Sequence, residues 1–341
     1  MKFITILIIF FFILPFTLAQ LKFGYYSFTC PIAEEIVSEV VQNYYQNDVT
    51  IAGALIRLHY HDCISNVRYL DTNFIPFFLK KNLFQGCDAS ILIDSKENRK
   101  SEKEARPNLT LRGFNLIDDI KSALEQQCPE TVSCADIITM ATREAIALAN
   151  GPRYHVLTGR RDGLVSNSLN VTIPGTLLNV PQALKKFNLK GLTLEDMVTL
   201  IGAHTIGFSK CNFFQNRLSS FRSGRIDPTM DPNLNAYLVK QCGSIFNPSG
   251  NHTSVFLDVE TPFDFDNKFY KQIINKRGIL KIDQQIALDP LSRKLVRNFA
   301  SGNFNFWDRF GVSWNKLGRI DVLVGNEGEI RRNCRAFNKD I

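Results

Sequence analysis

Eight cysteines constrain the fold of this 341-residue chain more than any other feature. The N-terminus indicates whether they form disulfides, because it indicates whether the chain is exported. Lys2 precedes an apolar run over residues 3–16, and the residues Thr17-Leu18-Ala19 follow it. This pattern is typical of a secretory signal peptide over residues 1–19, cleaved after Ala19. An even number of cysteines in an exported chain favours four disulfides over a zinc site or reactive thiols. The sequence therefore predicts a secreted, disulfide-bonded protein formed by residues 20–341.

A second interpretation of the N-terminus is an uncleaved signal anchor, which requires the apolar run to extend to Leu21. No later segment is long and apolar enough to span a bilayer, so we expect no membrane association after cleavage. The formal net charge is +7, but the 40 basic residues are dispersed rather than clustered with aromatic residues. We therefore expect no nucleic-acid binding, and instead adhesion to an acidic matrix such as a cell-wall polysaccharide.

Apolar residues recur at helical spacing along most of the chain, whereas strand-like alternation is scarce. After Pro31, a residue suited to the first turn of a helix, an apolar stripe continues to Tyr44. Thr193 and Asp196 have the spacing of a capping box, which predicts a helix that runs toward His204. The sequence thus predicts a mostly α-helical fold, with further helices from about residue 50 beyond 61 and over 134–149, 269–274, 291–299 and 305–317.

Two histidine segments are candidates for chemistry. Arg57 and His61 are four residues apart on a predicted helix, so they share one face, whereas His59 points roughly the other way. A cation beside a histidine disfavours the imidazolium and keeps the ring available as a base. His204 stands at a helix end between small residues, which would let a flat cofactor approach. Taken alone, both histidines are also consistent with structural roles, and Arg57 with a solvated charge.

A third candidate is the loop that holds Asp258, Thr261 and Asp266. It places hard oxygen ligands close together in the sequence, which suits Ca²⁺. The alternative is an ordinary acidic surface loop.

Many ordered segments between about residue 21 and residue 334 resemble plant secretory (class III) haem peroxidases. These segments are Arg57-Leu58-His59-Tyr60-His61-Asp62-Cys63, Gly86-Cys87-Asp88-Ala89-Ser90, Arg112-Gly113-Phe114, Val132-Ser133-Cys134-Ala135-Asp136, Gly159-Arg160-Arg161-Asp162, Gly202-Ala203-His204-Thr205-Ile206-Gly207, Phe265-Asp266-Asn267 and Gly328-Glu329-Ile330-Arg331. The resemblance implies an all-α fold with haem b between a distal and a proximal lobe. It also implies a secreted, monomeric enzyme of the cell wall that reduces hydrogen peroxide and oxidises small phenolic donors by one-electron steps.

The resemblance also implies roles for single residues. On the distal side, His61 would be the acid–base group, Arg57 would stabilise negative charge during O–O cleavage, and Asn108, supported by Glu102, would hold the His61 tautomer. His204 would be the axial iron ligand, with Asp283 accepting the hydrogen bond from its other nitrogen. Pro174 and Phe213 would contact the donor.

Two calcium sites and four disulfides follow from the same resemblance. The distal site would use Asp62, Ser65 (backbone), Gly86 (backbone), Asp88 and Ser90. The proximal site would use Thr205, Asp258, Thr261, Asp264 (backbone) and Asp266. The implied disulfides are Cys30–Cys128, Cys63–Cys87, Cys134–Cys334 and Cys211–Cys242.

One segment departs from the family pattern. Residues Val67–Gln85 separate Cys63 from Cys87, and deleting them restores the family spacing. Val67-Arg68 and Phe84-Gln85 can be encoded by the codons that begin and end an intron, so we hypothesise a retained intron or a gene-model error. A genuine loop insertion is the alternative. If the segment is translated, we expect a weakened distal calcium site and a displaced His61.

Smaller departures affect the expected pocket. Tyr60 replaces the usual phenylalanine, Pro174-Gly175-Thr176 lacks the second proline of the family, and the neighbours of Asp283 are atypical. Sequons at Asn108, Asn170 and Asn251 permit glycosylation. Because Asn108 is also the expected partner of His61, we expect it to carry no glycan.

Three other hypotheses about the protein compete with a secreted peroxidase. One is a secreted, disulfide-bonded glycoprotein of peroxidase fold with little or no activity, which only the insertion favours. Another is a zinc hydrolase that uses His59, His61 and Cys63, which oxidation of the cysteine would exclude. An intracellular peroxidase of similar fold is disfavoured by the signal peptide and the four cysteine pairs.

Overall fold

The structure is a computed structural model and describes residues 20–65, 86–218, 226–243, 253–302 and 305–340. The predicted signal peptide over 1–19, the inserted segment over 67–85 and the sequon at Asn251 lie outside these residues. In the part of the chain that is described, no helix has the length and apolar character needed to cross a membrane.

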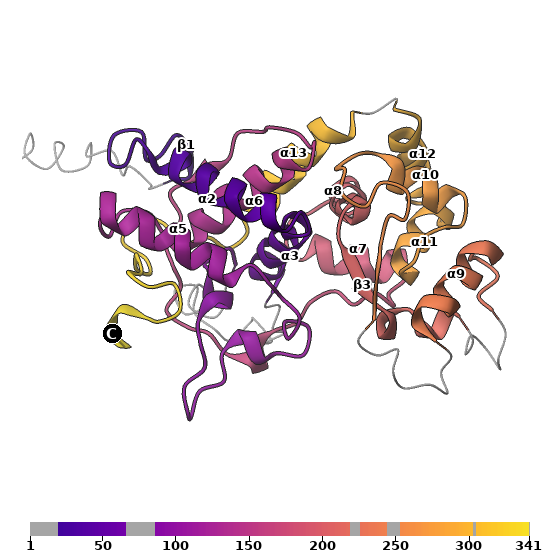
Figure 1. The fold of residues 1–341 in the computed structure, drawn as a ribbon, viewed down its shortest axis with the longest axis horizontal. Helices are drawn as coiled ribbons and strands as arrows, with labels where there is room; N and C mark the ends of the chain where they lie inside the picture. The colour runs from indigo at the N-terminus through magenta and orange to yellow at the C-terminus, as the bar shows by residue number, and fades with distance from the viewer. Residues whose placement is uncertain (1–19, 66–85, 219–225, 244–252, 303–304, 341) are drawn as a thin grey trace, which may run out of the picture.

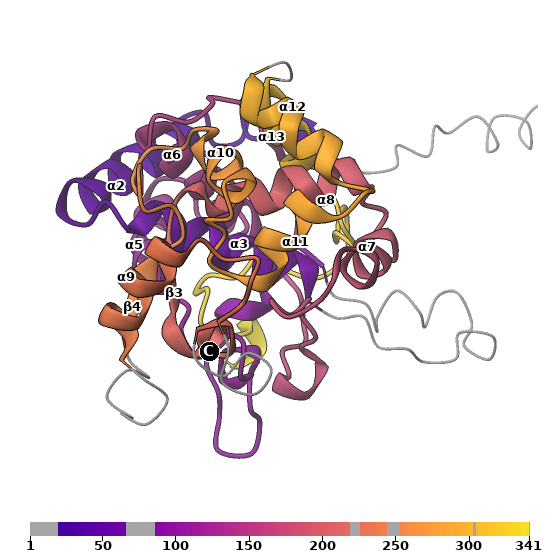
Figure 2. The ribbon, with the colours of Figure 1, turned by 90° about the vertical axis from the view of Figure 1, so that its right-hand side faces the viewer.

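The helices form two groups, which lie side by side in Figure 1 and are seen from another side in Figure 2. The first group contains α2 (Ala33–Asn47), α3 (Ile51–Ile64), α5 (Phe114–Gln127) and α6 (Cys134–Leu148). The second contains α7 (Val180–Asn188), α8 (Leu194–Ile201), α9 (Pro232–Cys242), α10 (Lys268–Ile274), α11 (Lys281–Leu288) and α12 (Arg293–Ser301). The last helix, α13 (Phe306–Leu317), contacts α8 of the second group and α3 of the first. The predicted all-α, two-lobed fold is confirmed.

The sequence predicts the helices that carry or lead to the two candidate histidines. Thr193 and Asp196 form the capping box of α8, and α8 continues into the 3₁₀ turn Gly202–Thr205 that carries His204. The predicted helices over 134–149, 269–274, 291–299 and 305–317 are α6, α10, α12 and α13, with ends shifted by at most two residues. The helices α5, α7, α9 and α11 were not predicted.

Two short antiparallel pairs are the only named strands among the described residues. β1 (Lys22–Phe23) pairs with β2 (Leu157–Thr158), and β3 (Phe208–Lys210) pairs with β4 (Ser254–Phe256). The second pair matters for the site, because it lays the segment just after His204 beside the segment that leads into Asp258.

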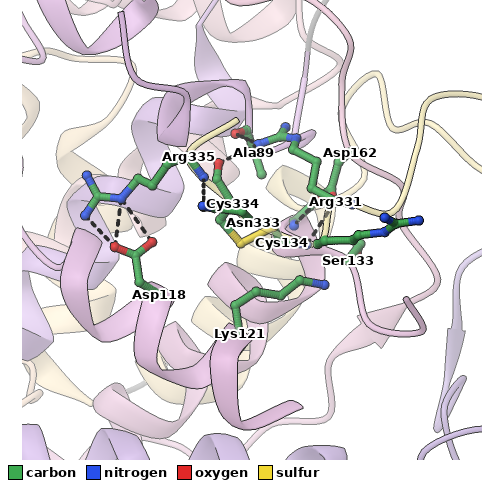
Figure 3. The surroundings of a disulfide bond; sticks show 12 residues. Ala89, Asp118, Lys121, Ser133, Cys134, Asp162, Arg331, Asn333, Cys334 and Arg335 are labelled. Atoms are coloured by element: carbon green, nitrogen blue, oxygen red, sulfur yellow. Dashed lines mark hydrogen bonds and ion pairs between the residues drawn. A yellow bond between two sulfur atoms is a disulfide. The ribbon is translucent and has the colours of Figure 1, made fainter. Parts of the chain in front are cut away.

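Four disulfides join Cys30 to Cys128, Cys63 to Cys87, Cys134 to Cys334 and Cys211 to Cys242. These are the four pairs that the resemblance implies. The Cys134–Cys334 bridge spans 200 residues and fastens the C-terminal segment to the start of α6 (Figure 3). A crosslink over so long a loop restricts the unfolded chain strongly.

Buried polar groups reinforce this attachment. The Asp162 carboxylate accepts hydrogen bonds from the amides of Cys134 and Ala135, where a negative charge suits a helix N-terminus, and from the amide of Arg331. The fully buried Arg331 guanidinium donates to the carbonyls of Ala89, Cys334 and Asp88, each at 3.0 Å. The C-terminal segment therefore supports the turn at 88–90, which carries candidate calcium ligands.

We expect Arg331→Gln to lower the free energy of unfolding by about 3 kcal/mol, because several buried carbonyls lose their donor. The neighbouring Arg332→Gln is the control, since Arg332 pairs with Glu130 at the surface and such pairs contribute about 0–1 kcal/mol. Urea unfolding followed by circular dichroism measures both variants. Equal midpoints for the two would contradict this account of the C-terminal segment.

Candidate active site

The helix α3 carries Arg57, His61 and Asp62, and its surroundings fix the orientation of the first two. The guanidinium of Arg57 donates to the Thr110 hydroxyl at 2.9 Å, to the Thr110 carbonyl at 3.1 Å and to the Pro107 carbonyl at 2.8 Å. The loop at 107–110 therefore holds both distal residues, because it also contains Asn108, the partner of His61. The anchors Pro107 and Thr110 were not predicted from the sequence.

A short chain of hydrogen bonds sets the tautomer of His61. Its Nδ1 lies 2.8 Å from Oδ1 of Asn108, and the Asn108 amide nitrogen donates to the Glu102 carbonyl at 2.8 Å. Since the asparagine presents its oxygen to the ring, Nδ1 must be the donor, and Nε2 carries the lone pair. Glu102 supports this chain through its backbone carbonyl.

Burial keeps His61 neutral. The residue is 6% exposed, and burial together with the neighbouring Arg57 lowers its pKa to about 3. Burial also lowers the pKa of Arg57 to about 10, so this side chain remains a cation at neutral pH. The pair therefore presents a neutral base beside a fixed positive charge.

His59 lies on the opposite side of α3 and has a different environment. Its Nδ1 accepts a hydrogen bond from the Trp314 indole at 3.1 Å, and burial lowers its pKa to about 3. His59, Cys63 and Cys87 lie close enough to suggest a metal site, but the two cysteines are joined in a disulfide. A disulfide offers no thiolate ligand, so the geometry does not favour a zinc site here.

The second histidine is presented by the end of α8. Nδ1 of His204 lies 2.8 Å from Oδ1 of Asp283, which belongs to α11 and is 1% exposed. A carboxylate accepts only, so Nδ1 is the donor and the lone pair of Nε2 is free to bind a metal. The His204 side chain is 33% exposed. Packing requires a glycine at position 202, because an added Cβ would lie 2.1 Å from the Tyr270 hydroxyl.

These residues fit a haem group. One imidazole keeps an Nε2 lone pair and a carboxylate on Nδ1, which is the arrangement of a strongly donating iron ligand. The other imidazole is neutral, buried and beside a cation. The structure brings Arg57 and Asn108 to His61, and Asp283 to His204, as the resemblance implies.

A buried carboxylate cluster follows His61 directly. Asp62 and Asp88 are each 2% exposed, and Asp62 Oδ1, Ser65 Oγ and Ser90 Oγ have no hydrogen-bond partner among the described residues. Burial and the nearby Asp88 raise the pKa of Asp62, and burial raises the pKa of Asp88 to about 6. Unpartnered oxygens beside two buried carboxylates fit a hard cation such as Ca²⁺. Gly163 leaves the room for this cluster, because an added Cβ would lie 2.1 Å from Asp88 Oδ2.

A second oxygen cluster lies next to His204. The Thr205 and Thr261 hydroxyls each contact a different oxygen of Asp266, both at 3.1 Å, and Asp258 accepts the Thr261 amide. Thr205 and Asp258 are fully buried. The Asp264 side chain accepts a hydrogen bond from Asn150 at 2.8 Å, and the Asp264 backbone bonds to the backbone of Thr261 and Asp266. The oxygen set fits Ca²⁺.

Two further expectations concern the donor contacts and the position of His61. Pro174 and Phe213 lie in surface segments, Phe213 at 40% exposure, and no hydrogen bond or ring contact of the described residues joins either to the two histidines. The expected displacement of His61, which the rate of peroxide-dependent haem oxidation would test, stays a prediction. The Cys63–Cys87 disulfide closes the ends of the insertion, and His61 keeps its bond to Asn108.

Comparisons with known proteins agree with this geometry. A family model described as peroxidase matches residues 37–302. Among similar proteins of Arabidopsis thaliana, Peroxidase 57 is 46% identical and covers 97% of each chain, and Peroxidase 28 is 45% identical and covers 98% of each. Peroxidase 44 is 44% identical over 97% of each chain. The chain therefore belongs to the peroxidase family, as its resemblance to the plant class III enzymes implies.

Proposed function

We propose that this haem peroxidase reduces hydrogen peroxide with His61 as its acid–base group and oxidises small phenolic donors by one-electron steps. The observation that carries the proposal is that the two imidazoles have the same tautomer, with the proton on Nδ1. Each is held through Nδ1, by Asn108 or by Asp283, and each therefore directs an Nε2 lone pair away from its support. One lone pair suits a proton, and the other suits iron.

Haem, when bound, supplies the iron centre at which the peroxide bond is broken. Nε2 of His61 would take the proton from one peroxide oxygen and return it to the other oxygen, which then leaves as water. Asn108 keeps Nδ1 protonated throughout, so the ring accepts and releases the proton at one atom. The Arg57 cation stabilises the negative charge that develops on the departing oxygen.

On the proximal side, His204 would bind the iron through Nε2. Asp283 accepts the Nδ1 proton and increases electron donation by the ring. Asp283 also accepts the Leu280 amide at 3.3 Å, which helps fix its carboxylate at the start of α11. The ligand and its support therefore come from two helices that the fold holds together.

We assign the two oxygen clusters to calcium. The distal ion would neutralise Asp62 and Asp88 and would also contact Ser65, Gly86 and Ser90. The proximal ion would use Thr205, Asp258, Thr261, Asp266 and the Asp264 backbone. Each cluster adjoins a histidine in the sequence, since Asp62 follows His61 and Thr205 follows His204. Each ion would thus brace one side of the haem site.

Further proposals concern the donor contacts, the location of the enzyme and its glycosylation. Pro174 and Phe213 would contact the donor at the haem edge, and the enzyme would be a secreted cell-wall monomer that associates with acidic polysaccharide. Asn108 would carry no glycan, a view that its 2% exposure and its two hydrogen bonds support.

Transcripts that lack codons 67–85 would support the retained-intron hypothesis, and their absence from sequenced messages would refute it. The alternative of an inactive glycoprotein gains no support from the comparisons.

We expect Asn108→Leu to slow peroxide-dependent haem oxidation by about 10²-fold, because His61 loses the acceptor that fixes its tautomer. Stopped-flow absorbance of the haem measures this rate. Asn170→Leu, at a sequon whose side chain has no described hydrogen bond to His61 or Asn108, is the matched control and should leave the rate unchanged. Equal rates for the two variants would refute the role of Asn108.

We expect about two calcium ions per chain in the purified protein, and about one in Asp266→Asn, since each site needs its charged ligands. Elemental analysis after gel filtration measures the content. Asp308→Asn, which changes an exposed carboxylate of α13, should keep the wild-type content. Undiminished calcium in Asp266→Asn would contradict the proximal assignment.

A further inference from the structure

A continuous series of aromatic rings leads away from His204. Its ring meets Phe269 edge to face at 6.0 Å between centroids, and Phe269 meets Tyr270 at 5.4 Å. Tyr270 in turn meets Phe306 at 5.2 Å. Phe269, Tyr270 and Phe306 are all buried, with exposures of 1%, 0% and 4%. The series therefore crosses the protein interior from the proposed iron ligand to the first residue of α13.

The series reaches the surface at Trp307. This residue follows Phe306 in α13 and is 42% exposed. Its indole nitrogen donates to the Phe265 carbonyl at 2.8 Å, and the Phe265 ring stacks on Phe306 at 5.4 Å with an interplanar angle of 9°. Trp307 is thus fixed against the inner rings by a hydrogen bond while one side of its indole remains open to solvent.

The identities of the rings give the series a direction. Tyrosine and tryptophan side chains lose one electron far more readily than phenylalanine, so Tyr270 and Trp307 are the oxidisable members and Phe269 and Phe306 separate them. Tyr270 is held in place by its hydroxyl, which donates to the Val198 carbonyl at 3.0 Å, and by Gly202, which leaves room for that hydroxyl. Ring contacts therefore join Tyr270, near the proximal histidine, to Phe306, and the surface residue Trp307 follows Phe306 directly in the chain.

We infer that Trp307 is a second oxidation site, at the surface, for phenolic groups carried on molecules too large to reach a buried haem. The inference rests on the proposed peroxidase function, which supplies the oxidant. For each peroxide, two phenol groups each release one electron and one proton and become phenoxyl radicals. The electrons pass inward through Trp307 and the aromatic series, and with the two protons they reduce the peroxide to two water molecules.

Spin trapping tests the inference without relying on turnover. The haem-loaded protein is mixed with peroxide and a nitroso spin trap in the absence of donor, and the trapped residue is located by peptide mass spectrometry. We expect the adduct on Trp307. Tyr237 is the internal control, because it is 43% exposed and lies on α9, a helix that carries no member of the aromatic series. Equal labelling of Tyr237, or no label on Trp307, would overturn the inference.

Two variants test the route. Tyr270→Phe keeps the ring but removes the oxidisable group, so we expect the Trp307 adduct to fall by at least about tenfold. Trp307→Phe should lower oxidation of phenol groups coupled to a large dextran by at least about tenfold, and should leave oxidation of the free phenol within about twofold. Tyr237→Phe should change neither rate. Loss of both activities in Trp307→Phe, or of neither, would count against a separate surface site.

These results separate the two levels of the account. If the wild-type protein oxidises free phenol but Trp307 is never labelled, the surface site is refuted and the proposed function stands. If peroxide does not oxidise the haem and free phenol is not consumed, the proposed function fails, and the surface site fails with it.

Discussion

The site depends on one constraint that occurs twice. In each histidine, a hydrogen bond makes Nδ1 the donor. Asn108 accepts it from His61 and Asp283 accepts it from His204, both at 2.8 Å. The two acceptors differ in charge, and this difference separates the two proposed roles, acid–base group for His61 and iron ligand for His204. The neutral amide leaves His61 a weak, buried base, whereas the carboxylate makes His204 a strong electron donor. The fold can be understood as the means of holding four side chains from distant segments in these two pairs.

Holding these side chains in place also buries carboxylates, and this burial has an electrostatic cost that bound cations would offset. Asp62 and Asp88 are buried beside the distal helix, and their raised pKa values show that the protein alone does not fully stabilise their charges. The fully buried Arg331 lies against the carbonyls of Asp88 and Ala89, so the C-terminal segment contributes one positive charge to this region. A calcium ion would supply the rest. Assembly of the distal side thus requires the helix α3, the turn at 88–90 and the end of the chain together.

Local signals predicted the elements that carry the histidines, and distant contacts decided the rest. The spacing of Arg57 and His61 and the Thr193 capping box are properties of one helix each, so the sequence shows them directly. The bond from Trp314 to His59 joins residues 255 apart, and no local pattern reveals it. The helix α11 was missed because its buried face contains Asp283 and Gln284, which interrupt the apolar stripe. The helix α5 was missed in the same way at the buried Lys121.

The two histidines are expected to be chemically distinct, and the absorption spectrum of the haem-loaded protein tests this most directly. His204→Leu should lose the histidine-ligated Soret band, because the substitution removes the proposed iron ligand. His61→Leu should keep that band and lose only its rapid change on addition of peroxide. A His204→Leu protein that retains the wild-type spectrum, or a His61→Leu protein that loses it, would contradict the assignment.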